Sequence, residues 1–242
     1  MVPTQLSRRR FLLSAVALAP APAKSVRLAD IEFQVLRNGR AARRYLLIHG
    51  NEQTAREVLT EHLQRFKGTA HLVAGRQRIV TAFGGRIDPN RLFSREGAAR
   101  SYRRYNPTWS EAELTAALNQ LDRARPKLLK ALLPKGGALI IAVHNNSEGY
   151  NVKEEAPISD AVHLPRPAEP HEFFLASSRS DFELLAKGPF NAVLQANPKG
   201  EEDGSLSRLC ARRGIRYVNL EAALGKADIQ REMLEWLEKT LP

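Results

Sequence analysis

Hydrophobic and polar residues follow short, regular patterns along the chain that predict strands. Residues 31–36 alternate between apolar and polar side chains, which is typical of a strand at the edge of a sheet. Residues 45–48 and 138–143 are continuous apolar runs, which are typical of strands buried on both faces. Shorter apolar runs predict further strands at residues 70–74, 79–83, 173–176, 192–195 and 217–220.

Amphipathic segments between these runs predict helices. Thr54 and Glu57 have the spacing of a capping box, and apolar residues at helical spacing follow as far as residue 66. Ser110 and Glu113 begin a second such segment, which runs to residue 133. Further helices are predicted at residues 180–187, 205–213 and 229–237.

The order of these elements predicts an α/β protein. Strands that alternate with helices favour a mixed, mostly parallel central sheet with helices on both faces. No internal repeat and no linker divides residues 24–242, so this segment is expected to form a single domain. Residues 145–170 hold four prolines and lack periodicity, and a loop of this length in a compact domain is often functional.

The first 23 residues have the pattern of an export signal. Basic residues precede an apolar run at 11–19, and small residues follow it. The pair Arg8-Arg9 resembles a bacterial twin-arginine signal. We therefore expect cleavage after Ala23, with Ala21 as the alternative, and a periplasmic or secreted protein. The apolar run is shorter than the about 20 residues of a membrane span, so no stable membrane insertion is expected after cleavage.

Composition and charge narrow the possible functions. The chain has 242 residues and is 43% hydrophobic, which is typical of a globular protein that needs no disulfide to fold. Its net charge is +11, but the basic residues are scattered along the whole chain, so nucleic-acid binding is not predicted. Cys210 is the single cysteine, and its helical surroundings favour a buried apolar role.

Residues that can bind a metal or move a proton follow three predicted strands. His49 and Glu52 follow one strand, His144 follows another, and Glu221 follows a third. The carboxyl ends of strands in an open α/β sheet line one crevice, so these residues can meet there. Two histidines and one carboxylate leave zinc an open position for a water molecule, whose pKa falls to about 7. A second carboxylate nearby can take the proton of that water and pass it to a leaving amine.

Four segments in the same order resemble the zinc carboxypeptidase superfamily, including its aspartoacylase and succinylglutamate desuccinylase branch. His-Gly-Asn-Glu at 49–52 resembles the first metal motif, His-x-x-Glu, and His144 after an apolar strand matches the third zinc ligand. Residues 88–93 are similar to the Asp-Leu-Asn-Arg-x-Phe segment, and residues 204–221 resemble the stretch that leads to the catalytic glutamate. The resemblance extends from about residue 45 to residue 225.

The resemblance implies a zinc carboxypeptidase-like fold and a set of ligands. It implies that His49, Glu52 and His144 bind Zn²⁺. It also implies that Asn90 and Arg91 bind the carboxylate of the substrate, and the planar fork of an arginine suits that group.

The resemblance also implies two catalytic residues. Glu221 would be the general base that activates the water on zinc. An arginine upstream of the Asn-Arg pair would stabilise the oxyanion. Arg86 is the prediction for this role, and Arg76 and Arg78 are the alternatives.

The sequence departs from the family pattern at two places. Residues 197–199 read Asn-Pro-Lys where the carboxypeptidases have a substrate-binding tyrosine, so Tyr150 or Lys199 would have to replace it. His144 is followed by two asparagines in place of a small hydroxyl residue. Candidates to replace it as a ligand lie downstream: His163, His171 and Glu172.

These residues predict an exported zinc-dependent hydrolase that cleaves an amide bond next to a substrate carboxylate. Its partner would be a peptide or small acidic substrate such as an N-acyl amino acid, and we expect a monomer that binds no nucleic acid. The alternative is a catalytically inactive carboxylate-binding protein of the same fold. A basic nucleic-acid or envelope-binding module would instead show steep salt dependence and no role for His49.

Overall fold

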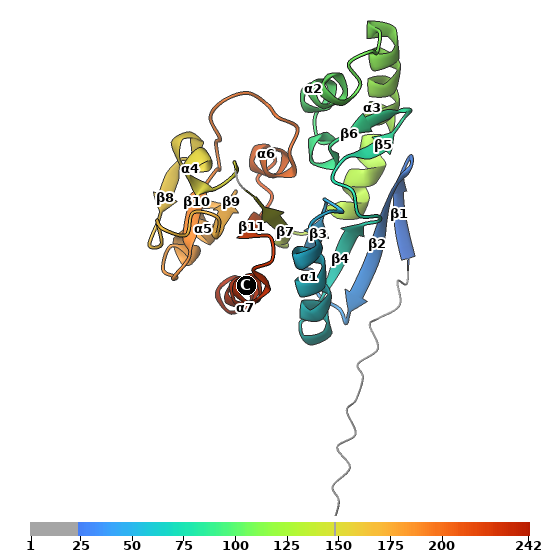
Figure 1. Cartoon of the computed structure of the whole chain (residues 1–242). Helices are drawn as coiled ribbons and strands as arrows, with labels where there is room; N and C mark the ends of the chain where they lie inside the picture. The colour runs from blue at the N-terminus through green and yellow to red at the C-terminus, as the bar shows by residue number, and fades with distance from the viewer. Residues whose placement is uncertain (1–23, 148) are drawn as a thin grey trace, which may run out of the picture.

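A mixed sheet of nine strands forms the centre of the protein (Figure 1). The computed structural model describes residues 24–147 and 149–242, so the predicted export signal at residues 1–23 lies outside the described residues. The strand order is β1-β2-β4-β3-β7-β11-β9-β10-β8. The strands are β1 (Lys24–Leu28), β2 (Ile31–Asn38), β3 (Arg44–Leu47), β4 (Gly68–Val73), β7 (Ile140–Asn146), β8 (Ala161–His163), β9 (Phe173–Ala176), β10 (Asn191–Leu194) and β11 (Tyr217–Ala223).

Parallel pairing is concentrated in the middle of this sheet. Strands β4, β3, β7 and β11 are parallel neighbours, and so are β9 and β10. The other four pairs, β1-β2, β2-β4, β11-β9 and β10-β8, are antiparallel. The predicted α/β class with a mixed sheet is confirmed. The predicted predominance of parallel pairs is wrong, because four of the eight strand pairs among the described residues of this sheet are parallel and four are antiparallel.

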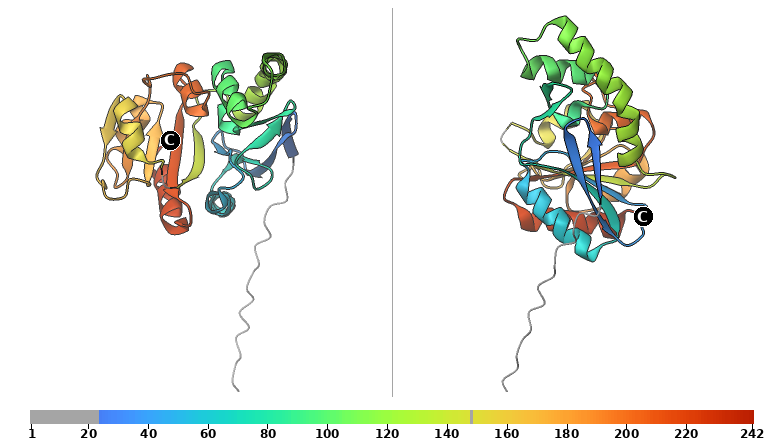
Figure 2. Two further views of the ribbon diagram at one scale, coloured as in Figure 1. Left: turned by 45° about the horizontal axis from the view of Figure 1, so that its top comes forward. Right: turned by 90° about the vertical axis from the view of Figure 1, so that its right-hand side faces the viewer.

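Helices cover both faces of the sheet, as predicted (Figures 1 and 2). Side chains of α2, α3 and α6 share one apolar core with the sheet, and those of α1, α5 and α7 share another. The predicted capping box of Ser110 and Glu113 is confirmed at the start of α3. The helices are α1 (Gln53–Arg65), α2 (Arg95–Tyr105), α3 (Glu111–Leu132), α4 (Val152–Glu155), α5 (Arg179–Leu185), α6 (Leu206–Arg212) and α7 (Ala227–Thr240).

Short elements complete the part of the chain that the structure describes. A two-stranded sheet is formed by β5 (Val80–Ala82) and β6 (Gly85–Ile87). The 3-10 helices are η1 (Pro89–Arg91) and η2 (Ala156–Ile158). Within residues 24–147 and 149–242, none of the helices combines the length and the hydrophobicity that a membrane span requires.

The predicted capping box at Thr54 and Glu57 is wrong. Helix α1 begins at Gln53, and its N-cap is Glu52, whose side chain makes no capping hydrogen bond. The hydroxyl of Thr54 accepts a hydrogen bond from the N–H of Gly225 instead. Thr54 thus bonds to the turn at Gly225 and not to the backbone of its own helix. The carboxylate of Glu52 makes no capping hydrogen bond either, so it can contact other side chains.

The loop before α6 lies directly against the start of α2. A Cβ atom on Gly97 would overlap the backbone of Asp203 and Gly204. Gly204 itself has a φ of +80°, and a Cβ there would lie 2.7 Å from the carbonyl oxygen of Arg91. Both glycines therefore allow the loop to approach η1, which places Asp203 beside Arg91.

Gly97→Ala is expected to lower the free energy of unfolding by about 1–3 kcal/mol, because the added methyl group meets backbone atoms that cannot rotate away. Chemical denaturation of the variant and the wild type would measure the difference. Equal free energies of unfolding would contradict the close packing of α2 against this loop.

Candidate active site

The carboxyl ends of three neighbouring strands bring the predicted residues together. His49 and Glu52 lie between β3 and α1. His144 lies in β7, and it is the register partner of Glu221 in the parallel strand β11. All four side chains are buried. The strand patterns therefore place one histidine pair and two carboxylates at the same edge of the sheet.

His49, Glu52 and His144 form a cluster that can hold a metal ion. The Nδ1 atom of His49 lies 2.8 Å from Oε1 of Glu52, and Nδ1 of His144 lies 3.1 Å from Oε2. The candidate ligand atoms all lie within 4.8 Å of one another. Ligand atoms around one tetrahedral zinc ion are about 3.3 Å apart, so the donor set fits such an ion.

The state of the Glu52 carboxylate also suits a metal ion. Oε2 of Glu52 is buried and makes no hydrogen bond, although it lies near His144. Burial raises the pKa of Glu52, but the two histidines lower it more, so that the pKa falls to about 2. Metal binding requires an ionised carboxylate, and the cluster holds Glu52 in that form.

Asp88 supports His49 from the side opposite Glu52. Nε2 of His49 lies 2.9 Å from Oδ1 of Asp88, which also accepts a hydrogen bond from the N–H of Asn90. Burial alone would lower the pKa of His49, but Asp88 and Glu52 together raise it. A metal-binding histidine commonly donates its second ring N–H to a carboxylate, which fixes its tautomer. The sequence matched Asp88 to a segment of the family pattern but predicted no contact with His49.

A chain of amide hydrogen bonds fixes Glu52 relative to His144. The N–H of Ala55, in the first turn of α1, donates to Oδ1 of Asn145 at 2.7 Å. Asn145 donates to Oε1 of Gln230 at 3.2 Å, and Gln230 donates to the carbonyl oxygen of His144 at 2.8 Å. These bonds join α1, β7 and α7, so the distance between the two ligands depends on all three elements.

Glu221 is a buried carboxylate with one uncommitted oxygen. Its Oε1 atom accepts a hydrogen bond from Asn219 at 3.0 Å, whereas Oε2 is buried without a partner. Burial raises the pKa of Glu221 to about 7, although the charge of His144 opposes this rise. A carboxylate with such a pKa can both accept and return a proton near neutral pH. The alternation of β11 places Asn219 on the same face, a signal that the sequence contained.

A cavity of about 440 Å³ opens over these residues, and the predicted Asn90 and Arg91 line it. Arg86 is exposed on β6 and does not line this cavity. Arg78 lines it instead, with Nη1 at 3.2 Å from Oε1 of Glu52. Gly50 allows this approach, because a Cβ atom there would lie 2.8 Å from the carbonyl oxygens of Gly75 and Gln77.

The alternative ligands from the long loop do not join the cluster. His171 lies 3.0 Å from Oδ1 of Asn146, and His163 lies in the edge strand β8. Glu172 is buried but does not line the cavity. Tyr150 does line it and donates from its hydroxyl to Glu155 at 2.8 Å, whereas Lys199 does not.

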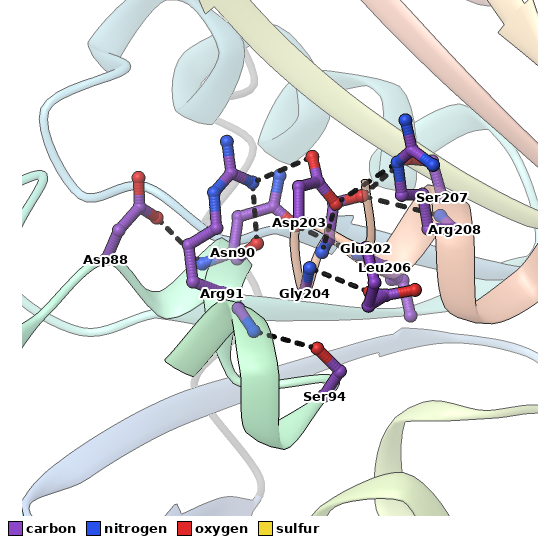
Figure 3. Close-up of polar contacts among 12 residues, drawn as sticks. Asp88, Asn90, Arg91, Ser94, Glu202, Asp203, Gly204, Leu206, Ser207 and Arg208 are labelled. Atoms are coloured by element: carbon purple, nitrogen blue, oxygen red, sulfur yellow. Dashed lines mark hydrogen bonds and ion pairs between the residues drawn. The ribbon is translucent and has the colours of Figure 1, made fainter. Parts of the chain in front are cut away.

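One acidic side chain that lines the cavity lies between two arginines (Figure 3). Asp203 is 3.7 Å from Nη1 of Arg91 and 3.6 Å from Nε of Arg208. Asn90 is fixed there, because its Oδ1 atom accepts a hydrogen bond from the N–H of Leu206 at 3.1 Å. The two arginines outnumber the single carboxylate, so this end of the cavity carries a net positive charge. The sequence analysis missed Asp203 and Arg208.

No protein-family model matches the sequence, and no curated protein matches it. Solved structures do match. A succinylglutamatedesuccinylase/aspartoacylase from Rhodobacter sphaeroides has 14% identity and a TM-score of 0.42, and the match covers 87% of this chain and 59% of that chain. A "putative metallopeptidase" from Shewanella denitrificans has 12% identity and a TM-score of 0.44, with coverage of 90% and 84%. The ectoine utilization protein EutE (DoeB) from Ruegeria pomeroyi has 15% identity and a TM-score of 0.41, with coverage of 86% and 60%.

The matched structures include the branch that the sequence motifs resemble, the succinylglutamate desuccinylases and aspartoacylases. The match spans only 59% of the length of that protein.

Proposed function

We propose that this protein is a zinc-dependent hydrolase that cleaves an amide bond next to a carboxylate of the substrate. One observation carries the proposal. A single cavity is lined by the His49–Glu52–His144 cluster, by the half-free carboxylate of Glu221 and by Arg91. Metal binding, proton transfer and carboxylate recognition are thereby available within one site.

His49, Glu52 and His144 would hold the zinc ion, and Asp88 would orient His49. When bound, zinc polarises a substrate carbonyl and lowers the pKa of a water molecule to about 7. Carboxylate and imidazole ligands of this kind, with one position left open, are typical of catalytic zinc sites.

The other side chains would bind the substrate and move the proton. Glu221 accepts the proton of the attacking water at Oε2 and then donates it to the leaving amine. The guanidinium of Arg91 pairs with the substrate carboxylate, and Asn90 can add a neutral donor. Arg78 replaces Arg86 as our candidate for stabilising the oxyanion, because it lies beside Glu52 in the cavity.

Removal of the metal is expected to abolish hydrolysis. The purified protein should contain one zinc per chain by elemental analysis. It should hydrolyse N-acyl amino acids or short peptides that end in a free carboxylate. A chelator should remove the activity, and added zinc should restore it. Amidation of the substrate carboxylate should lower kcat/KM by about 10- to 100-fold, since a charge-assisted hydrogen bond to Arg91 is lost.

Two outcomes would contradict the proposal. Protein without bound metal that hydrolyses these compounds would rule out the zinc mechanism. Protein that binds the carboxylate compounds and hydrolyses none of them would favour the inactive binding protein instead.

We further propose that the chain is exported and that a signal is removed after Ala23. The basic and apolar pattern of the first 23 residues supports this. Sequencing of the amino terminus of the mature protein should then find Lys24 first. An intact Met1 in protein from the cell envelope would contradict cleavage.

A further inference from the structure

Glu155 is a carboxylate in the cavity that the proposed reaction does not use. It is the last residue of α4, within the long loop, and it lines the cavity. The hydroxyl of Tyr150 donates to its Oε1 atom at 2.8 Å, and Nε2 of Gln195 donates to Oε2 at 2.5 Å. Both donors are neutral. Within residues 24–147 and 149–242, the structure gives Glu155 no ion pair with a lysine, arginine or histidine.

The surroundings of Glu155 hold its carboxylate in one orientation. The ring of Tyr150 packs against Phe173, with ring centroids 6.0 Å apart. Gln195 directly follows β10 and is 4% exposed, and it also donates to the hydroxyl of Ser159 at 3.3 Å. The carboxylate is thus fixed before any ligand arrives. A fixed negative charge that has only neutral partners gains most from a cationic ligand.

The negative charge of Glu155 and the positive charge of Arg91 lie on opposite sides of the metal-binding cluster. Along the sheet the cluster occupies the ends of β3 and β7, and Gln195, which holds Glu155, follows β10 farther along. Arg91 lies instead beyond Asp88, which contacts His49 at the end of β3.

We propose that Glu155 binds a positively charged nitrogen group of the substrate. The scissile amide would lie at the cluster, with a carboxylate toward Arg91 on one side and a cationic group toward Glu155 on the other. The inference rests on the proposed hydrolase function and adds its substrate class: amides that carry both a carboxylate and a cation. An ion pair of this kind is expected to favour cationic over neutral substrates by about 10- to 100-fold.

Two peptides test this preference. N-acetyl-lysyl-alanine and N-acetyl-norleucyl-alanine share a free carboxylate and differ at the end of one side chain, which carries an ammonium group only in lysine. For the wild-type protein, kcat/KM should be about 10- to 100-fold higher for the lysyl peptide. Dissociation constants from calorimetry on metal-free protein should differ in the same direction, which gives a readout that does not depend on hydrolysis.

Two variants locate the source of the preference. Glu155→Gln keeps the size of the side chain and removes its charge, so the ratio between the two peptides should fall to about one. Glu169→Gln makes the same charge change at an exposed position in the same loop, outside the cavity lining, and should keep the wild-type ratio.

The remaining outcomes distinguish a failure of the proposed role of Glu155 from a failure of the proposed hydrolase function. Hydrolysis of both peptides at equal efficiency by the wild type would overturn the role of Glu155 and leave the hydrolase function standing. Failure to hydrolyse either peptide would count against the hydrolase function, and equal dissociation constants would then still overturn the role of Glu155. The wild-type comparison needs no variant, so instability of Glu155→Gln would not affect it.

Discussion

Glu221→Gln is expected to lower kcat by roughly 10²- to 10⁴-fold while the zinc content stays at one per chain. Glutamine has nearly the same shape as glutamate and can still accept the hydrogen bond from Asn219. It cannot accept the proton of the attacking water, so the effect should appear in kcat. Because Glu221 is not one of the three clustered ligands, the metal should remain. Steady-state kinetics together with elemental analysis would measure both quantities.

Glu172→Gln provides a matched control for this variant. Glu172 is also a buried glutamate, and burial raises its pKa as well, but it does not line the cavity. Its replacement should leave both kcat and zinc content near the wild-type values. Retention of more than about one tenth of kcat in Glu221→Gln would show that another group acts as the base, given the rate effects usual for general bases.

His49→Ala is expected to remove zinc from the purified protein. The change deletes one of the three proposed ligands and removes one partner from each of the carboxylates of Glu52 and Asp88. The zinc affinity should fall by more than 100-fold. Asp88→Asn, which keeps the ligand and alters only its support, should weaken zinc binding by about 10- to 100-fold. Competition with a chromogenic chelator would rank the three proteins.

His163→Ala is the control for this series, since His163 lies in β8 and was one of the three alternative ligands, with His171 and Glu172, that the sequence offered. Its zinc affinity should equal that of the wild type. Equal zinc binding by His49→Ala and the wild type would remove the basis of the metal site. Loss of zinc from His163→Ala would mean that the long loop supplies a ligand.

Much of the fold could be predicted because the central strands have a strong signal. The continuous apolar runs in β3 and β7 are buried on both faces, which leaves them few places other than the middle of a sheet. The proportion of parallel pairs could not be predicted in the same way. It depends on which strands become neighbours, and the short strands β8, β9 and β10 carry no local signal for their partners.

Some residues of the candidate site could be predicted from the sequence, and others could not. His49, His144 and Glu221 could be placed because strand ends converge in α/β sheets. Arg86 could not be separated from Arg78 by the sequence, because the choice depends on how the turn before β5 approaches Gly50. Glu155 lies in the loop of residues 145–170. This loop has no helical or strand periodicity, so its course and the position of Glu155 could not be predicted from the sequence.

The hydrogen bonds between α7 and the residues beside the proposed ligands determine when the site can form during protein synthesis. Gln230 holds the carbonyl of His144 and the side chain of Asn145, and that side chain in turn caps α1 beside Glu52. A ribosome releases the chain from its amino terminus, so the two ligand segments emerge long before α7. The ligands therefore reach their final spacing only when the last helix docks. If the proposed zinc site is correct, a nascent chain without α7 is expected to bind the ion less tightly than the finished protein.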